Sequence, residues 1–267
     1  MDPNNYNTIE AMVKAFEKAA RFLQEEEPDC IIAPMFGAVP FIDILNIVDE
    51  NFPNHKVEYV PASNKVHRLR QVLRGAFMNI IDAYAPHGGK FISLDEVVSG
   101  NSLVRVYKQF SAARMQHANR ATIDMYGETA DFREPNVSGY RDDLVKSIVY
   151  KTVGVVDPKL RRTGKKMSPE YEALVEQGVV WPVDTEGIVT MDRTEFFPAK
   201  YLRETDGDGN KVYSPVVNGF TVSPEYIKFL KQVASIVGKD PDRVTLSNMG
   251  KISEAHKWVP EELRYVS

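Results

Sequence analysis

The residues best suited to chemistry lie between Asp95 and Ser102, in the run Asp-Glu-Val-Val-Ser-Gly-Asn-Ser. An apolar segment, residues 90–94, precedes them, and a helical pattern follows. Ser99 and Ser102 offer hydroxyl groups, and Gly100 permits a close approach to the backbone. The N-terminus of a helix adds free N–H groups and a positive dipole. A carboxylate before such a turn can bind ribose hydroxyls or hold Mg²⁺ through water. These residues indicate a site for a sugar phosphate.

A purely structural role fits the same residues. Ser102 could cap the following helix, and Asp95 could be an acid at the end of a strand. The residue types alone leave both interpretations open.

Two further turns carry residues suited to an anion. The first spans residues 33–40 and includes Gly37, where the backbone can approach a ligand closely. The second spans residues 61–70 and includes Lys65 and Arg68, which could neutralise a leaving group. The alternatives are an ordinary connection between a strand and a helix for the first turn, and a solvated basic face for the second.

The elements that must position these turns follow a regular alternation. Short apolar strands separated by helix-length segments indicate a parallel sheet with right-handed crossovers, and ligands of such sheets bind beyond the carboxyl ends of the strands. We therefore expect an α/β fold with about five parallel strands flanked by helices, with residues 90–94 on a central strand. The expected strands are 30–33, 57–60, 90–94, 121–126 and 152–156, and the expected helical faces lie within 9–23, 41–48, 69–81, 103–115 and 140–149.

The pattern changes after residue 157, which divides the chain into a core, 1–157, and a C-terminal elaboration, 158–267. The basic stretch 159–166 is a candidate to close over the site. The turn at 206–210 has acids at calcium-loop positions, but Lys211 replaces the turn glycine, so a hairpin is expected. A helix is expected near residues 224–237.

The run from Asp95 to Ser102 resembles the phosphate-binding turn of type I phosphoribosyltransferases. In that family an apolar strand leads to paired acids, a short spacer and then Thr-Gly-x-Thr or a close variant, which opens a helix. The order of elements over residues 9–157 is also similar, whereas residue-level matching is confined to two or three turns. The resemblance implies a phosphoribosyltransferase-like fold.

The resemblance also implies roles for particular residues. Ser99, Gly100, Asn101 and Ser102 would bind the 5-phosphate of phosphoribosyl pyrophosphate. The acids would order the ribose diol and hold Mg²⁺. The residues with implied catalytic or metal-binding roles are Asp95 and Glu96, and those that would contact pyrophosphate are Gly37, Ala38, Lys65 and Arg68.

The match departs from the family pattern at the acids. Counted back from Gly100, Asp95 falls on the second acid, Leu94 on the first, and Val98 on the position where purine-specific members carry a general base. The other alignment pairs Asp95 and Glu96 with the two acids and shortens the spacer by one residue. Either alignment argues against a purine base-salvage activity.

Three functions remain open at this point. The first is an enzyme, a glycosyltransferase that moves a ribose-5-phosphate unit from phosphoribosyl pyrophosphate to a base-like acceptor with Mg²⁺, or a hydrolytic version acting on a nucleotide or RNA. The second is a non-catalytic regulatory or interaction protein that senses a nucleotide. The third is an α/β scaffold without a ligand.

Composition limits the partners. The 267 residues carry a net charge of −4, so no global basic field favours nucleic acid, although the basic stretch 159–166 leaves local contact with RNA open. The single cysteine, Cys30, lies in an apolar run and is expected in the core. No secretory or membrane-spanning pattern is visible, which predicts a cytoplasmic protein. A homodimer remains open.

Overall fold

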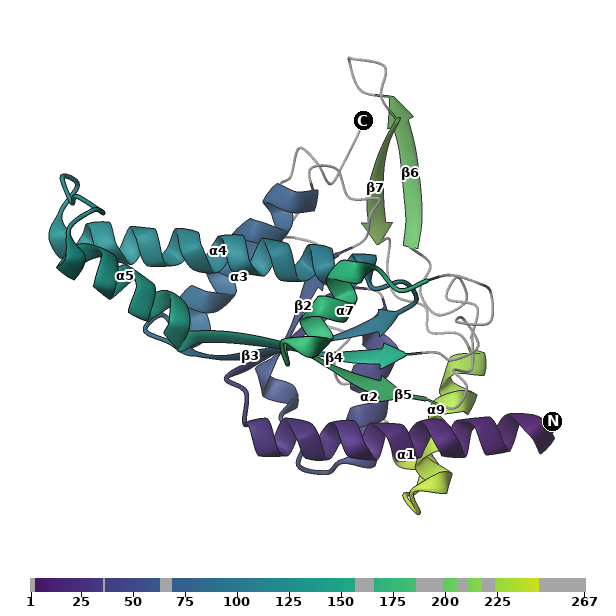
Figure 1. The fold of residues 1–267 in the computed structure, drawn as a ribbon. Coiled ribbons are helices and arrows are strands. Elements are labelled where there is room, and N and C mark those ends of the chain that lie inside the picture. Colours follow the sequence, from purple (N-terminus) through teal and green to yellow (C-terminus); the bar gives the residue numbers. More distant parts are fainter. Residues whose placement is uncertain are drawn as a thin grey trace.

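The structure is a computed structural model that describes residues 3–35, 37–62, 69–156, 166–185, 199–205, 211–217 and 224–244. Parallel strands alternate with helices through most of the chain (Figure 1). The strands of the main sheet are β1 (Cys30–Met35), β2 (Val57–Pro61), β3 (Gly89–Val97), β4 (Ile148–Val156) and β5 (Val180–Asp184). The helices are α1 (Pro3–Glu26), α2 (Val39–Val48), α3 (Leu69–Tyr84), α4 (Asn101–Tyr126), α5 (Pro135–Ser147), α7 (Pro169–Glu176) and α9 (Pro224–Ile236), with short 3-10 turns η1 (Asn54–Lys56) and η2 (Pro241–Arg243).

The main sheet has five strands in the order β2-β1-β3-β4-β5, and every neighbouring pair is parallel. The predicted α/β fold with a five-stranded parallel sheet is therefore confirmed. Residues 90–94 lie on β3, the central strand, as expected. The chain runs from β1 outward to β2 and then returns to the other side of β1 as β3. Such a reversal is where open α/β sheets usually bind ligands.

The predicted strand at residues 121–126 is wrong, because these residues form the last turns of α4. Their β-branched residues suggested a strand, but Thr122 is fully buried and its hydroxyl donates to the carbonyl of Ala118 at 2.7 Å, a helical i to i−4 contact. The helix ends at Gly127, whose φ is +88°. The fifth strand comes instead from β5, so the sheet extends beyond the boundary expected at residue 157.

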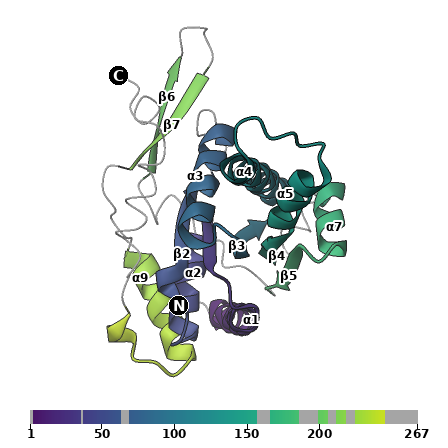
Figure 2. The same ribbon diagram turned by 90° about the vertical axis from the view of Figure 1, so that its left-hand side faces the viewer.

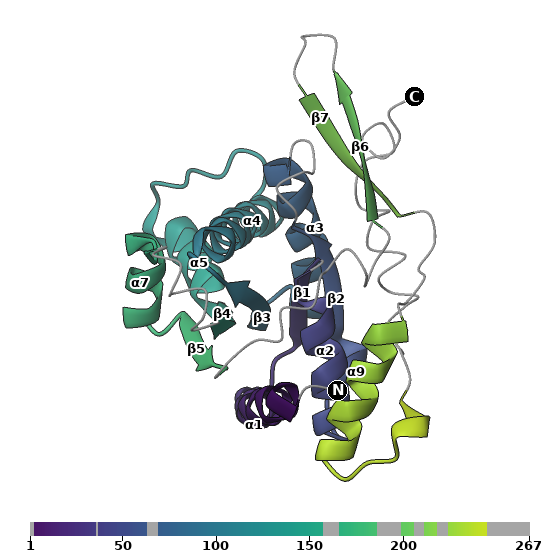
Figure 3. The same cartoon turned by 90° about the vertical axis from the view of Figure 1, so that its right-hand side faces the viewer.

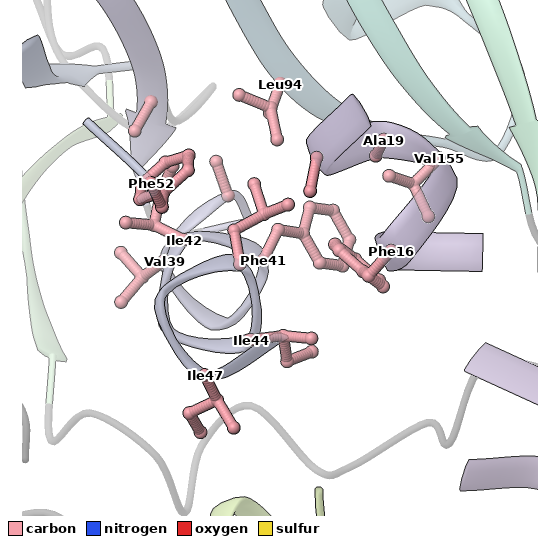
Figure 4. Close-up of a cluster of buried hydrophobic side chains, with 14 of the residues drawn as sticks. Phe16, Ala19, Val39, Phe41, Ile42, Ile44, Ile47, Phe52, Leu94 and Val155 are labelled. Atoms are coloured by element: carbon pink, nitrogen blue, oxygen red, sulfur yellow. The ribbon is translucent and has the colours of Figure 1, made fainter. Parts of the chain in front are cut away.

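Helices cover both faces of the sheet. Helices α1, α2 and α9 contact one another on one side, and α3, α4, α5 and α7 pack on the other (Figures 2 and 3). The first side contains the larger apolar core, in which α1 and α2 side chains meet the inward face of the strands (Figure 4). Helix α1 begins at Pro3, before the helical face expected within residues 9–23. Its predicted apolar face is buried, and so is Cys30.

Helix α9 ties the C-terminal part of the chain to this core. The hydroxyl of Tyr226 donates a hydrogen bond to the Asp43 carboxylate on α2, and both side chains are buried. Burial raises the pKa of Asp43 to about 7, and the hydrogen bond from Tyr226 opposes that rise. The hydroxyl of Tyr59 on β2 is buried nearby, and the Asp43 charge adds to the effect of burial in raising the Tyr59 pKa.

The remaining strands form a hairpin. Strands β6 (Ala199–Thr205) and β7 (Lys211–Val217) pair antiparallel, which confirms the expected hairpin around residues 206–210. The turn itself lies outside the described residues, and so does all of the basic stretch 159–166 except its last residue. Within the described residues, no helix has the length and apolarity needed to cross a membrane.

Candidate functional site

The predicted phosphate cradle, residues 99–102, joins the central strand to α4. Strand β3 continues to Val97, three residues further than expected, and α4 begins at Asn101. Gly100 is the N-cap residue, with φ +79° and ψ −10°, a left-handed conformation that favours glycine. Because Gly100 has no side chain, it cannot cap the helix, and Ser102 lies inside the first turn. The capping role considered for Ser102 is therefore wrong, and the N-cap residue gives the first amides of α4 no side-chain cap.

A tyrosine from α7 occupies the space beside Gly100. A Cβ added to Gly100 would lie 2.5 Å from both Cβ and Cγ of Tyr171. The same ring reaches towards Gly154 on β4, where an added Cβ would lie 3.6 Å from the Tyr171 hydroxyl. Gly154 pairs in register with Asp95. Gly100 thus makes room for the Tyr171 ring, whose hydroxyl end lies near Gly154 at the carboxyl end of β4.

Helix α7 also holds the cradle through its backbone. The N–H of Ser168 donates to the carbonyl of Ser99 at 2.9 Å, and the Ser168 side chain caps α7. Lys108 on α4 pairs with Glu170 on α7 at 2.7 Å. The conformation of the cradle therefore depends on a helix about 70 residues further along the chain.

From the sequence, Gly100 is expected to let an anion approach the backbone. The structure gives a different reason for this glycine. The side-chain position of Gly100 faces Tyr171, so the glycine is required for packing and for its positive φ. Replacing Gly100 cannot distinguish a phosphate site from a structural turn. Tests of binding must use the side chains of Ser99 and Ser102, which are partly exposed, or of Asn101, which is exposed.

The two predicted acids do not share a face of the sheet. Successive residues of a strand point to opposite sides. Asp95 lies on the same side as Ser93 and Phe91, towards α3 and α4, whereas Glu96 lies on the side of α1 and α2. Asp95 is buried, its Oδ1 accepts the Glu96 N–H at 2.9 Å, and Glu96 is partly exposed.

A buried polar network lies below Asp95. The Tyr150 hydroxyl donates to Ser93 Oγ at 2.7 Å, and Ser93 Oγ lies 2.8 Å from Thr152 Oγ1. Burial raises the pKa of Tyr150 to about 12, and the Asp95 charge contributes to the rise. Tyr150 therefore stays neutral and acts as a hydrogen-bond donor beneath the site.

Sequence reasoning missed Arg105, which the structure places at the cradle. Its Nη2 donates to Ser102 Oγ at 3.3 Å. Burial lowers the pKa of this guanidinium, the nearby Asp95 carboxylate opposes that change, and Arg70 at the start of α3 reinforces it. The sequence does contain a signal for this contact: Arg105 follows Ser102 by three residues, a spacing that places the two side chains on one face of a helix.

The residues expected to contact pyrophosphate are only partly described. Gly37 lies just after β1 and is partly exposed. The N–H of Ala38 donates to the carbonyl of Pro34 at 3.1 Å, and its side chain is buried, so this amide is already engaged. Pro40 lies in the first turn of α2. Lys65 and Arg68 lie outside the described residues.

The described residues contain no group of three or more histidine, cysteine, aspartate or glutamate side chains able to hold a metal ion. Mg²⁺ is commonly held by one or two carboxylates together with the phosphates of a substrate. Because Asp95 and Glu96 point to opposite faces of the sheet, only Asp95, on the side of α4, fits that second arrangement, and the prediction that both acids hold the metal together is not supported.

The cradle and the loop after β1 lie at the same edge of the sheet. Both follow the carboxyl ends of neighbouring parallel strands, and they flank the point where the strand order reverses. The structure thus brings together the amides of α4, Asp95, Arg105 and the loop containing Gly37 at one edge.

Comparison of the chain with protein-family models, with curated proteins and with solved structures finds no match.

Proposed function

We propose that this protein binds a phosphorylated ribose, as phosphoribosyl pyrophosphate or a nucleotide, and transfers the ribose-5-phosphate unit to a base-like acceptor. One observation carries the proposal. Gly100, the N-cap residue, gives the first turn of α4 no side-chain cap, and this turn lies at the carboxyl end of the central strand beside Asp95 and Arg105. The N-terminal amides of a helix, its dipole and a guanidinium are together suited to a phosphate.

Each residue has a distinct part in the proposed reaction. The amides and hydroxyls of residues 99–102 bind the 5-phosphate, with Arg105 completing the charge balance. The Asp95 carboxylate accepts hydrogen bonds from the ribose hydroxyls and stabilises positive charge that develops on the sugar as the bond to pyrophosphate breaks. Gly37, Lys65 and Arg68 contact the departing pyrophosphate.

Mg²⁺ would be bound by the Asp95 carboxylate together with the phosphates of the ligand, and it would neutralise part of the negative charge of those phosphates. The residues of the chain then orient the ribose and exclude water.

A second candidate function is nucleotide sensing without turnover. The divergence of Asp95 and Glu96 to opposite faces favours it, because a single buried carboxylate already near Arg105 is less able to order a metal and a diol together. In this case the ligand would act through α7, which contacts the cradle directly.

Calorimetric titration with phosphoribosyl pyrophosphate and Mg²⁺, combined with an assay of pyrophosphate release, tests the proposal. We expect binding by the wild type and a loss of about tenfold or more in affinity for Ser102→Ala, which removes a hydroxyl from a charged ligand. Asp95→Asn keeps the shape and loses the charge, so turnover should fall by roughly a hundredfold while affinity changes less.

Ser138→Ala, on α5 away from the cradle, is the matched control and should behave as the wild type. Binding without any pyrophosphate release would favour the sensing function. If the folded wild-type protein binds no phosphorylated ribose, both the transferase function and the sensing function are wrong.

A further inference from the structure

Helices α3 and α4 pack side by side with a constant register, which defines the α3–α4 seam. Asp82 Oδ1 lies 2.8 Å from His117 Nδ1, and Arg74 Nη2 donates to Gln109 Oε1 at 3.2 Å. Both contacts join residues 35 apart in the sequence. The two helices therefore run parallel, and each step of four residues along one matches a step of four along the other.

The shared offset of 35 residues relates further positions of the two helices to one another. Between the two polar contacts lie Met78 and Ala113, both in the same apolar cluster. One step towards the N-terminal ends brings Arg70 opposite Arg105. The other three pairs are an acid with a histidine, two apolar residues, and an arginine with a glutamine. The pair nearest the cradle consists of two positively charged side chains.

The electrostatics of Arg105 agree with this placement. Its Nε is buried and has no hydrogen-bond partner among the described residues. Its pKa is lowered by burial and further by Arg70, while Asp95 is the carboxylate that opposes the shift. The Nε of Arg74 is also buried without a partner in the described part of the chain. Arg105 thus lies near both the Arg70 guanidinium and the Asp95 carboxylate at this end of the seam.

Like charges that face each other on neighbouring helices repel, and an anion bound between them would remove that repulsion. Guanidinium groups match the geometry of a phosphate, to which they can donate two parallel hydrogen bonds. The hydrogen bond from Arg105 to Ser102 connects this end of the seam to the first turn of α4.

We propose that Arg70 and Arg105 form a clamp for a phosphoryl dianion, which bridges α3 and α4 at the N-terminal end of their seam. The clamp rests on the proposed function only for the identity of the ligand: its phosphoryl group is the one that residues 99–102 bind. The consequence is a site that selects a terminal phosphate monoester, since a dianion balances two guanidinium groups, and that discriminates against an unphosphorylated nucleoside.

Thermal unfolding with inorganic phosphate as the probe tests the clamp, with sodium chloride at matched ionic strength as the reference. We expect phosphate to raise the Tm of the wild type by about 3–5 °C at saturating concentration. Arg70→Gln and Arg105→Gln should each lose this rise. Without phosphate, Arg70→Gln should be at least as stable as the wild type, because it removes the repulsion.

Arg21→Gln, an exposed arginine on α1, is the control for a change in net charge and should keep the full response. Arg70 is exposed, so Arg70→Gln is expected to fold even if Arg105→Gln does not. A wild-type Tm that does not respond to phosphate, or a full response in Arg70→Gln, would overturn the clamp.

The clamp and the proposed function can fail separately. If phosphate protects the wild type but neither variant, and phosphoribosyl pyrophosphate binds no more tightly than phosphate, the clamp stands and the ribose assignment falls. If phosphoribosyl pyrophosphate binds the wild type and Arg70→Gln equally, the clamp falls and the function stands.

Discussion

Replacing Gly100 with valine is expected to destabilise the protein by roughly 4 kcal/mol or more, or to prevent folding, because two mechanisms act together. The φ of +79° disfavours a β-branched residue, and the new Cβ would lie 2.5 Å from the Cβ and Cγ of Tyr171. Urea denaturation of both proteins measures the difference. Gly75→Ala is the matched control, since nothing lies within 4 Å of its added Cβ, and it should be neutral or stabilising by up to about 1 kcal/mol.

A double-mutant cycle separates the two mechanisms. Tyr171→Ala removes the ring, so Gly100→Ala should cost less in that background than in the wild type, and the coupling should be about 1–3 kcal/mol. Additive effects would show that Tyr171 does not press on the cradle.

Raising the pH from 5 to 8 is expected to lower the free energy of unfolding through Asp43. Its pKa is about 7 in the folded protein against an ordinary value of 3.8, because burial disfavours the charged form. Between these values the folded protein holds a proton that the unfolded chain releases, so stability falls as pH rises and levels off above pH 7. The expected loss is about 2–3 kcal/mol over this range.

Other carboxylates act in the opposite direction, so the measurement must isolate Asp43. The pKa of Glu26 is lowered, chiefly by its hydrogen bond from Lys151, and its contribution is lost as pH falls. Urea denaturation of the wild type and Asp43→Asn across the same pH range removes this shared background. The difference between the two proteins should change with pH, and parallel curves would contradict a raised pKa for Asp43.

The fold was largely predictable because its signals are local. Short apolar runs such as Cys30–Ala33 and Val57–Val60 alternate with amphipathic helices, and that alternation alone indicates a parallel sheet. The error at residues 121–126 arose where local preference and tertiary context disagree. A β-branched run there continues a helix that is packed along α3 and α5. The fifth strand, Val180–Asp184, was missed because its short run lies beyond the apparent change in composition.

The candidate site was predictable only in part. The cradle's position at the start of a helix followed from the sequence, and α4 does begin at Asn101. The sequence could not show why residue 100 is a glycine, because the residue beside it, Tyr171, comes from a helix far along the chain. Likewise, Arg70 and Arg105 are 35 positions apart, and only the packing register of α3 against α4 relates them. Local patterns locate a turn, whereas long-range packing decides what surrounds it.

The dependence of the cradle on α7 has a consequence for how this chain reaches its native state. During synthesis, β3 and α4 emerge long before Tyr171, so the turn at Gly100 must wait for its packing partner. Until β5 pairs with β4, the latter is an edge strand with unpaired backbone groups. The intermediate therefore has an incomplete ligand site and an edge strand that can pair with another chain. The late segment 169–184 completes the site with Tyr171 and covers the edge with β5.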